Sequence, residues 1–310
     1  MSKKVLITED LHPFLVRGLE NLGYECDERF GILQQEVTPI IHLYHGIVVA
    51  TRIIVGREII ERASSLKFIA RAGSGMENID VVYAEAKNIS CISSPEGNAN
   101  SVGEHAAALL LAIFHNITQS FLQTRNEQWL VEENRVHELD GRTIAIIGYG
   151  NTGKAFAKKL PPFNMKVLAY DKYLRNYGDA FAEEAEMKRI FDEAEIISFH
   201  VPLTEETKWM IDTQYLQRFK EQIHLINTSR GKIIRHKDLL ECIHNGKVLD
   251  AALDVYENEN LTSHTQEERN LFRELINTGR VIFTPHVAGK SFESKKKIAE
   301  VLLKKISSLS

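Results

Sequence analysis

The chain has 310 residues, with 44% hydrophobic and 26% charged residues and a formal net charge of −4. This composition is typical of a globular protein and excludes a disordered chain, and the length suits two domains better than one. The two signs of charge are interspersed and no long basic tract occurs, so we expect no binding to nucleic acid through its phosphates.

The N-terminal stretch MSKKVLITEDL has two lysines but only a short apolar run, so it lacks the core of a signal peptide. No later stretch approaches the ~18 apolar residues of a membrane span. We therefore expect a cytoplasmic protein without a membrane partner. Cys26, Cys91 and Cys242 are odd in number and widely separated, which favours buried thiols over a disulfide framework or a metal site.

Short apolar runs alternate with helical patterns from end to end, which is the signature of βαβ units and parallel sheets. The first part of the chain predicts a helix within 11–23 and strands at 4–8, 46–50, 66–70 and 89–92. The segment 100–126 then predicts one long helix that opens on Ser101 and Glu104 in capping-box spacing. Its apolar, alanine-rich surface suits close packing against another helix.

A second alternation begins at residue 142, with strands expected at 143–147, 166–170, 195–199, 223–227, 249–254 and 280–284. Helical patterns lie between these strands, so this part of the chain predicts an α/β doubly wound parallel sheet. The last segment, ESKKKIAEVLLKKISSL, predicts an amphipathic helix that packs back on the first domain.

The stretch RTIAIIGYGNTGKAFAKKL (142–160) gives a strand, then Gly148, Gly150 and Gly153, and then a helix. A bare G-x-G-x-x-G pattern is weak, but here it stands in the strand–turn–helix context that dinucleotide binding requires. Gly148 permits the tight turn, Gly150 lets the backbone approach a pyrophosphate, and Gly153 lets helix and strand pack closely. The helix N-terminus then offers amides and a positive dipole to the anion.

The same residues spell most of a Walker A loop, which would indicate an NTPase. That loop needs Ser or Thr after the lysine to hold Mg²⁺, whereas Ala155 follows Lys154 here. A dinucleotide site instead expects a carboxylate about 20 residues further on, and VLAYD supplies Asp171. A carboxylate there repels the ribose phosphate of NADP, so NAD is the expected cofactor, although the nearby Arg175 could modify this preference.

Three successive predicted strands of the second part end on groups that suit hydride transfer to a carbonyl. Arg230 follows the first, Asp254 ends the second with Glu257 and Glu259 in the loop beyond it, and His286 follows the third. Such a reaction needs a group that moves a proton and a cation that holds the substrate. Taken alone, a histidine such as His286 in TPHVAG is more often an ordinary structural or solvated residue than an acid/base.

The segments GYGNTG, VLAYD, HVPLT, INTSRG, AALDVYENE and TPHVAG occur in this order. Together with RAGSGMENID (71–80) and SSPEGNANSVGEHA (93–106), they closely resemble the D-isomer-specific 2-hydroxyacid dehydrogenase family over nearly the whole chain. The resemblance implies two Rossmann-like domains. One is a flavodoxin-like substrate domain, 1–98 plus 287–310, and the other a doubly wound NAD-binding domain, 99–286.

By position, the resemblance assigns Arg230 to the substrate carboxylate and carbonyl, His286 to the general acid/base, and Glu259 to the carboxylate that partners the histidine. It also assigns a set of residues to NAD, namely Gly148, Tyr149, Gly150, Asn151, Thr152, Gly153, Asp171, His200, Val201, Pro202, Thr207, Thr228 and Asp254. The candidate substrate residues in the first domain are Arg71, Ser74, Gly75 and Asn98, together with Arg52, which is suggested by its place on a strand.

Two departures from the family pattern stand out. Asn260 follows Glu259 where the family usually has proline, so choosing Glu259 over Glu257 depends on the spacing from Arg230. Pro161 and Pro162 replace a glycine that usually closes the helix after the glycine motif, which ends that helix by another route.

The substrate remains open between two groups of 2-hydroxy acids. RAGSG keeps Arg71, but Ala50 stands where phosphoglycerate dehydrogenases tend to have an arginine, and Arg52 lies two residues on, on the same face of a strand. The expected substrate pair is 3-phosphoglycerate and 3-phosphohydroxypyruvate. The alternative is a reductase of glyoxylate, hydroxypyruvate or another small 2-keto acid.

Two further expectations concern partners and regulation. The family resemblance and the apolar helix at 101–118 predict a homodimer, and a chain of this length leaves no room for an appended regulatory domain. A nucleotide-sensing binding protein is the remaining alternative, because corepressors that resemble this family keep its catalytic residues.

Overall fold

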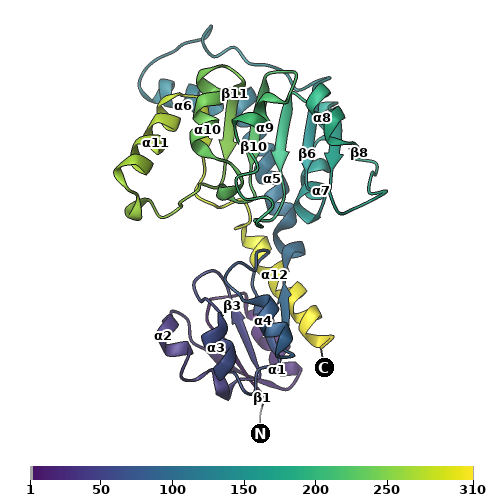
Figure 1. The fold of residues 1–310 in the computed structure, drawn as a ribbon, viewed down its shortest axis with the longest axis vertical. Helices are drawn as coiled ribbons and strands as arrows, with labels where there is room; N and C mark the ends of the chain where they lie inside the picture. The colour runs from purple at the N-terminus through teal and green to yellow at the C-terminus, as the bar shows by residue number, and fades with distance from the viewer. Residues whose placement is uncertain (1–2, 310) are drawn as a thin grey trace. The chain divides into compact units, whose positions relative to one another are not determined.

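The computed structural model describes residues 3–309 and divides the chain into two compact units. Unit 1 contains the chain up to Ala99 together with the segment from Lys290 onwards, and unit 2 is Asn100–Gly289. Each unit is built around one parallel sheet with helices on both faces, as the ribbon in Figure 1 shows. The predicted α/β fold class with two Rossmann-like domains is confirmed.

Unit 1 has a five-stranded sheet in the order β2-β1-β3-β4-β5, which is the flavodoxin-like order. Its strands are β1 (Lys3–Ile7), β2 (Tyr24–Glu28), β3 (Gly46–Val49), β4 (Phe68–Arg71) and β5 (Ser90–Ser93). Its helices are α1 (Pro13–Asn21), α2 (Gln34–Val37), η1 (Ile41–Leu43), α3 (Arg57–Arg62), α4 (Val81–Ala86) and α12 (Phe292–Ser307).

Unit 2 has a seven-stranded sheet in the order β12-β11-β10-β9-β6-β7-β8. Its strands are β6 (Thr143–Ile147), β7 (Lys166–Tyr170), β8 (Glu183–Glu184), β9 (Ile196–Phe199), β10 (Ile223–Asn227), β11 (Val248–Leu253) and β12 (Val281–Phe283). Because the strand order reverses between β6 and β9, a crevice for a ligand is expected at the carboxyl ends of these two strands.

The helices of unit 2 cover both faces of this sheet. They are α6 (Ile117–Arg125), α7 (Asn151–Ala157), η2 (Pro161–Phe163), α8 (Met187–Glu193), α9 (Thr213–Gln217), η3 (Gly231–Ile233), α10 (His236–His244), η4 (Leu261–Ser263) and α11 (Gln266–Asn277). The helix α5 (Pro95–Phe114) begins in the last residues of unit 1 and continues in unit 2.

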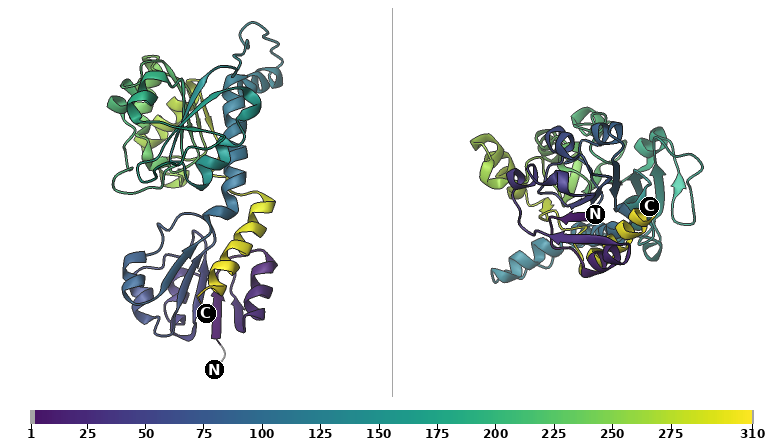
Figure 2. Two further views of the ribbon diagram at one scale, coloured as in Figure 1. Left: turned by 90° about the vertical axis from the view of Figure 1, so that its right-hand side faces the viewer. Right: turned by 90° about the horizontal axis from the view of Figure 1, so that it is seen from below.

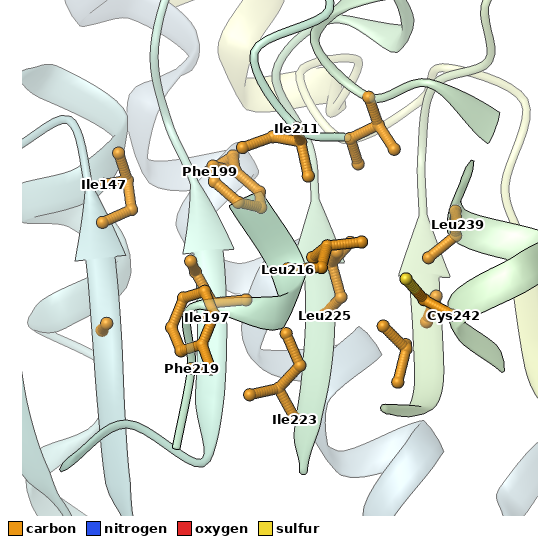
Figure 3. Close-up of a cluster of buried hydrophobic side chains, with 14 of the residues drawn as sticks. Ile147, Ile197, Phe199, Ile211, Leu216, Phe219, Ile223, Leu225, Leu239 and Cys242 are labelled. Atoms are coloured by element: carbon orange, nitrogen blue, oxygen red, sulfur yellow. The ribbon is translucent and has the colours of Figure 1, made fainter. Parts of the chain in front are cut away.

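The alternation of side chains along each strand of unit 2 supplies two separate apolar cores. Ala145 and Ile147 of β6 face the core under α8 to α11, whereas Ile144 and Ile146 face the core under α5 and α7. Figure 3 shows the first core, in which residues such as Phe199, Phe219 and Leu225 lie on one face of the sheet. Each fully buried Leu, Ile or Phe side chain contributes about 1.5–3 kcal/mol to folding.

The C-terminal helix α12 belongs to unit 1, where it packs beside α1 and against β4 and β5. Figure 2 shows this helix, drawn in yellow, alongside the purple first helix. Ala299, Leu302 and Ile306 are buried there. Gly18 of α1 lies so close that an added Cβ would stand 2.2 Å from a methyl group of Leu303.

The long helix predicted over 100–126 differs in the structure in both its start and its continuity. It begins at Pro95, so Ser101 and Glu104 lie inside it, and the predicted capping box is wrong. The Ser101 hydroxyl instead donates to the carbonyl of Ala288, at 2.6 Å. A break at Asn116, whose φ is +47°, separates α5 from α6.

The apolar face of α5 is covered within the chain itself. Ala106, Leu109, Leu110 and Ile113 are all buried in the second core of unit 2. Among residues 3–309, no single helix is long and apolar enough to cross a membrane. Only the pair α5 and α6 reaches that length and composition, and the two helices are bent by 63°.

Candidate active site and cofactor site

The loops that carry the predicted residues of unit 2 all follow the carboxyl ends of its parallel strands. The glycine motif follows β6, Asp171 follows β7, and His200 follows β9. The other three motifs follow β10, β11 and β12, and they carry the residues Thr228, Arg230, Asp254, Glu259 and His286. The sheet therefore brings these segments to one edge.

The glycine motif has the geometry that a pyrophosphate requires. Gly148 has φ +92°, and an added Cβ would lie 2.6 Å from the carbonyl oxygen of His200. A Cβ at Gly153 would stand 2.1 Å from the carbonyl oxygen of Gly148, which explains the close approach of α7 to the turn. Gly150, just before α7, is exposed, and an added Cβ there would meet nothing within 4 Å. An anion can therefore approach the amides of Asn151 and Thr152.

Asp171 is fixed beside this turn by three backbone amides. Oδ2 accepts a hydrogen bond from the amide of Tyr149 at 3.0 Å. Oδ1 accepts from the amides of Tyr173 and Leu174, at 3.0 and 3.1 Å. An ionised carboxylate has about four acceptor positions, so capacity is left for a ribose hydroxyl.

The segments after β9 and β10 supply polar groups on the other side of the switch point. His200 is buried, and its Nε2 lies 2.9 Å from the hydroxyl of Ser198. Burial lowers the pKa of His200 to about 3, so the ring is neutral. Thr207 donates to the carbonyl of Pro202 at 2.6 Å and so closes the loop that also holds Val201.

Thr228 brings an unsatisfied polar group to this edge of the sheet. Its hydroxyl is buried at the end of β10 and has no hydrogen-bond partner among residues 3–309. Buried polar atoms are almost always satisfied, so this hydroxyl is a natural contact for a bound molecule. Together with the open approach at Gly150, it shows that the residues present fit a dinucleotide.

His286 and Glu259 form a close pair at the ends of β12 and β11. The Nδ1 atom of His286 lies 2.9 and 2.8 Å from the two carboxylate oxygens of Glu259. Both side chains are about half exposed, at 42% and 45%. Because Nδ1 faces the carboxylate, Nε2 on the opposite side of the ring is the atom left for a substrate.

Glu257, the other acidic residue considered for this position, has a different contact. Its Oε1 accepts the backbone amide of His236 at 2.5 Å, at the start of α10. It also lies 3.0 Å from Nδ1 of the buried His236. Glu257 therefore stabilises the N-terminus of α10, and Glu259 is the residue beside His286.

Arg230 lies in the turn between β10 and η3 and is partly buried. Its Nη1 donates to the carbonyl of Ser229 at 2.8 Å, and its own carbonyl accepts from the side chain of Asn227 at 3.0 Å. An added Cβ at Gly231 would lie 1.9 Å from the carbonyl oxygen of Tyr256. This close approach fixes the arginine turn against the segment that leads to Glu259.

Asp254, predicted as a cofactor contact, has its carboxylate occupied by the chain itself. Its side chain is fully buried. Oδ1 accepts from the hydroxyl of Thr284 at 2.5 Å and from the amide of Val287 at 2.9 Å, and Oδ2 accepts from the amide of Ala288 at 2.8 Å. Burial raises the pKa of this carboxyl, but the hydrogen bonds from His105, Thr284 and the two amides outweigh it, so the pKa is lowered overall.

The backbone of His286 adopts a conformation that is unfavourable for a residue with a side chain. Its φ is +54°, which costs on the order of 1–2 kcal/mol for an L-residue other than glycine. Its amide donates to the carbonyl of Asp254 at 2.8 Å and to that of Thr284 at 3.0 Å. Asp254 thus holds the loop of His286 through both its main chain and its side chain.

Of the predicted substrate residues of unit 1, Arg71 is the last residue of β4 and Asn98 lies near the start of α5. Arg52 follows β3. Ser74 donates to the side chain of Asn98 at 2.9 Å, and Gly75 follows Ser74 in the same loop. Arg71 is buried, and its Nη1 donates to the carbonyl of Ala72 at 2.6 Å. These four residues therefore belong to one region of unit 1.

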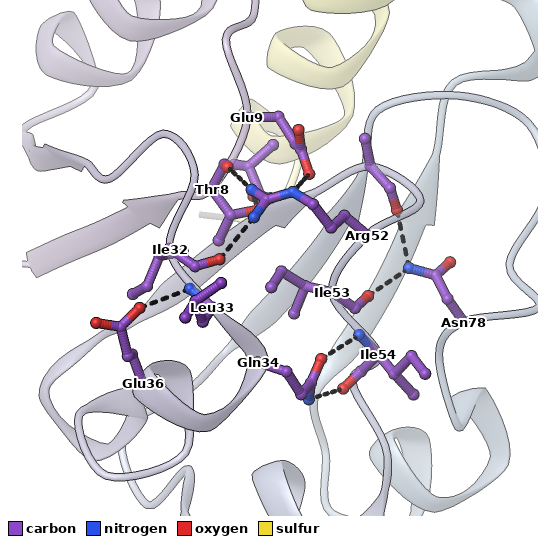
Figure 4. A network of polar contacts seen from close by, with 12 residues as sticks. Thr8, Glu9, Ile32, Leu33, Gln34, Glu36, Arg52, Ile53, Ile54 and Asn78 are labelled. Carbon is purple, nitrogen blue, oxygen red and sulfur yellow. Dashed lines mark hydrogen bonds and ion pairs between the residues drawn. The ribbon is translucent and has the colours of Figure 1, made fainter.

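Arg52 is engaged by other groups of unit 1, as Figure 4 shows. Its two terminal nitrogens donate to the carbonyls of Ile32 and Thr8, at 2.7 and 2.9 Å. Its Nε lies 3.4 Å from a carboxylate oxygen of Glu9. These contacts tie three loops of unit 1 together, a role that the sequence did not suggest.

Sequence reasoning did not identify His105 of α5. Its Nε2 lies 3.0 Å from the hydroxyl of Thr284 and 3.5 Å from Oδ1 of Asp254. No local motif marks this contact, because it joins positions 179 residues apart. Among residues 3–309, no group of three or more His, Cys, Asp or Glu side chains could hold a metal ion.

Known proteins share both the sequence pattern and the fold. The profile described as D-isomer specific 2-hydroxyacid dehydrogenase, NAD binding domain, matches residues 107–288. A hydroxypyruvate reductase of Thermotoga maritima is 34% identical over 273 residues, which cover 88% of this chain and 87% of that protein. A D-3-phosphoglycerate dehydrogenase of Methanocaldococcus jannaschii is 31% identical over 306 residues. The match covers 98% of this chain but only 56% of that relative.

A solved structure agrees with these sequence relatives. The crystal structure of D-lactate dehydrogenase from Aquifex aeolicus complexed with NAD and lactic acid matches with a TM-score of 0.82 at 25% identity. The match covers 99% of this chain and 95% of that one. The profile and the relatives support an oxidoreductase with NAD as its cofactor. The chain belongs to the D-isomer-specific 2-hydroxyacid dehydrogenase family.

Proposed function

We propose that the chain reduces a short 2-keto acid to the D-2-hydroxy acid, with His286 as the proton donor, Glu259 as the group that orients it and Arg230 as the substrate clamp. The observation that carries this proposal is the contact of Nδ1 of His286 with both carboxylate oxygens of Glu259. It fixes the ring and leaves Nε2 for the substrate. When bound, NADH supplies the hydride.

In the reduction, hydride adds to C2 of the keto acid while the electron pair of the carbonyl double bond moves onto its oxygen. Nε2 of protonated His286 then gives its proton to that oxygen, and the ring is protonated again from solvent. The carboxylate of Glu259 holds Nδ1 and so keeps Nε2 directed away from it, toward the substrate. Oxidation of the hydroxy acid uses the same groups in reverse.

Arg230 is suited to the substrate carboxylate. A guanidinium stays protonated at any working pH, so it cannot be the acid, but its planar fork matches a carboxylate in two hydrogen bonds. Its turn also lies against the segment leading to Glu259. The same cation stabilises the negative charge that develops on the carbonyl oxygen.

For the substrate we favour an unphosphorylated 2-keto acid such as hydroxypyruvate or glyoxylate. Arg52, the candidate partner for a phosphate, donates to two backbone carbonyls and pairs with Glu9. Ala50 replaces the arginine that would otherwise serve. The Thermotoga maritima relative, which covers the chain and is covered by it to similar extents, is a hydroxypyruvate reductase.

The second candidate is 3-phosphohydroxypyruvate. Arg71 is kept in the loop that holds Ser74, and several relatives near 31% identity are D-3-phosphoglycerate dehydrogenases. Those relatives are about twice as long as this chain, which spans 52–56% of their length. The two candidates differ in one phosphate group, so a direct competition separates them.

The test is steady-state NADH consumption with glyoxylate, hydroxypyruvate and 3-phosphohydroxypyruvate. We expect kcat/KM to be highest for an unphosphorylated acid, and a higher value for 3-phosphohydroxypyruvate would reverse the ranking. His286→Ala should lower kcat by about 10²–10⁴-fold while NADH binding, measured by fluorescence, is retained. Near-wild-type turnover by His286→Ala would exclude the proposed acid, and no turnover of any acid by the wild type would favour a binding protein.

We further propose that the chain forms a homodimer through unit 2. The support is a set of exposed apolar side chains on α6 and the loop after it, which we call the α6 surface: Ile117, Phe121, Leu122, Trp129, Val131 and Val136. The apolar face of α5 is covered within the chain, so α6 and its loop are the part of this region left for a partner.

A further inference from the structure

We infer that His105 is a positioning residue for His286, acting through Thr284 and Asp254 on the loop that carries the histidine. The inference rests on the proposed function in that it takes His286 as the proton donor. All four residues lie within unit 2. His105 lies on α5, far in sequence from the glycine motif and from the strand that precedes His286, and no part of the proposed chemistry already includes it.

The direction of the hydrogen bonds follows from the carboxylate. Asp254 is ionised, since its pKa is lowered, and an ionised carboxylate only accepts hydrogen bonds. The single hydroxyl proton of Thr284 is therefore donated to Oδ1 of Asp254. Toward His105, the Thr284 oxygen is an acceptor, so Nε2 of His105 carries the proton in their 3.0 Å contact. The chain runs from His105 to Thr284 to Asp254.

This chain ends on the backbone of the loop that carries His286. The carboxylate of Asp254 accepts the amides of Val287 and Ala288, the two residues after His286. Thr284, two residues before it, is held between Asp254 and His105. Both sides of His286 are thus tied to one buried carboxylate, which holds its left-handed backbone and with it the direction of the ring.

His105 can hold this carboxylate in place because it lies on α5, a separate element that does not move with the loop. Its ring is three-quarters buried, with 23% of the side chain exposed, and α5 is anchored in the core by its apolar face. The Ser101 hydroxyl, one turn earlier on α5, also donates to the carbonyl of Ala288. The helix therefore holds the loop of His286 at two points, and the hydrogen bond of His105 acts on the carboxylate through Thr284.

Loss of the His105 side chain should make the loop that carries His286 more mobile while the rest of unit 2 stays folded. His105→Leu removes the donor at similar size, and His105→Gln keeps an N–H near the position of Nε2. Thr284→Val and Thr284→Ser form a second matched pair, in which only serine keeps the hydroxyl. His115→Leu, at an exposed histidine just beyond the end of α5, is the control for the loss of a histidine.

The experiment combines two readouts on these variants of the full chain. Hydrogen–deuterium exchange followed by mass spectrometry reports the amides of Val287 and Ala288, and steady-state kinetics with the best 2-keto acid reports kcat and KM. For His105→Leu and Thr284→Val we expect at least about tenfold faster exchange in the peptide 284–289 and a kcat lower by about 10–100-fold, with KM for NADH within about threefold.

His105→Gln, Thr284→Ser and His115→Leu should stay near the wild type in both readouts. Unchanged exchange at 284–289 in His105→Leu and Thr284→Val would overturn the inference, and so would faster exchange with an unchanged kcat. If one of these variants fails to fold, the other pair decides alone. A wild type that reduces no 2-keto acid would defeat the proposed function instead, since the exchange comparison needs no turnover.

Discussion

At the scale of single residues, the acidic loop after β11 shows what sequence can and cannot distinguish. Glu257 and Glu259 are two residues apart in a segment without regular structure, and either could have partnered His286. In the structure, one caps α10 and the other contacts the imidazole. Their side chains contact residues 21 and 27 positions away, so only the tertiary fold separates the two roles.

This difference gives a matched prediction for the two glutamates. Glu259→Gln should lower kcat for reduction, because a neutral amide holds Nδ1 of His286 less firmly than the carboxylate does. Glu257→Gln should leave kcat in place and lower the melting temperature, because it weakens the N-terminal contact of α10. The checks are steady-state kinetics and thermal unfolding of both variants. Equal losses of kcat in the two variants would contradict the assignment.

Asp171 illustrates a residue whose place the sequence does give. The spacing from the glycine motif marks it, and the structure fixes it with three amides beside that motif. The wild type should therefore have a higher kcat/KM with NADH than with NADPH, because the carboxylate repels the ribose phosphate. Asp171→Ala should narrow this gap, whereas Lys154→Ala, as the control, should leave the ratio in place. A wild type that prefers NADPH would refute the role given to Asp171.

The contacts of Asp254 and His105 could not be predicted from sequence. Asp254 was recognised because it ends a strand, and its role as an anchor of the His286 loop became visible only when Val287 and Ala288 were placed beside it. His105 stands in an alanine-rich helix without a motif of its own. Side-chain hydrogen bonds between distant segments have no periodicity, so pattern reasoning does not detect them.

At the scale of elements, apolar strands were predictable and polar edge strands were not. β1 and β3 are central, buried strands, and their continuous apolar runs mark them. β2 is the edge strand YECDE, in which three of the five residues are acidic, and no strand was expected there. β8 has only two residues, both glutamate. An edge strand pairs with one strand instead of two and is more exposed to solvent, so its sequence shows a weaker apolar pattern.

The boundaries of α5 show how one local signal can hide another. Ser101 and Glu104 have the spacing of a capping box, yet the helix starts at Pro95, and proline is itself common in the first turn of a helix. The break at Asn116 was also missed, although asparagine tolerates the left-handed conformation better than most residues. The apolar periodicity predicted the helix but not its ends.

The helix α12 offers a prediction at this scale, because its sequence is distant from the core that it completes. Leu302 is fully buried among residues of α1 and the unit 1 sheet. Leu302→Ala should lower the free energy of unfolding by about 2–5 kcal/mol through lost contacts and a residual cavity. The exposed Leu309, mutated to alanine, is the control and should change little. Urea denaturation measures both, and equal effects of the two changes would show that α12 does not contribute through this packing.

At the scale of the whole molecule, the two sheets follow the two strand orders that parallel α/β proteins use most often. The alternation of short apolar runs with helical patterns was sufficient to predict the fold class, because parallel strands require crossover helices. The substrate is a different matter. A phosphorylated substrate would need a guanidinium that can bind its phosphate. Arg52 has the right residue type, but its guanidinium donates to the carbonyls of Ile32 and Thr8, and the sequence does not show these contacts.

The assembly of the protein gives the last prediction. Trp129 is 83% exposed, Val131 65%, Phe121 60% and Ile117 54%, and such a group of large apolar side chains is unusual on the surface of a monomer. A symmetric interface requires a second copy of the chain, which carries the same apolar side chains. A stable interface buries about 800 Å² on each side.

We expect light scattering to give the mass of a dimer at micromolar concentration. Phe121→Asp combined with Trp129→Asp should give a folded monomer, because charges cannot be buried unpaired. Phe292→Asp changes an aromatic residue that is 96% exposed on α12, outside this surface, and should leave the dimer intact. A wild type that is monomeric at tens of micromolar, or a dimer that survives the double substitution, would mean that the α6 surface does not join two copies.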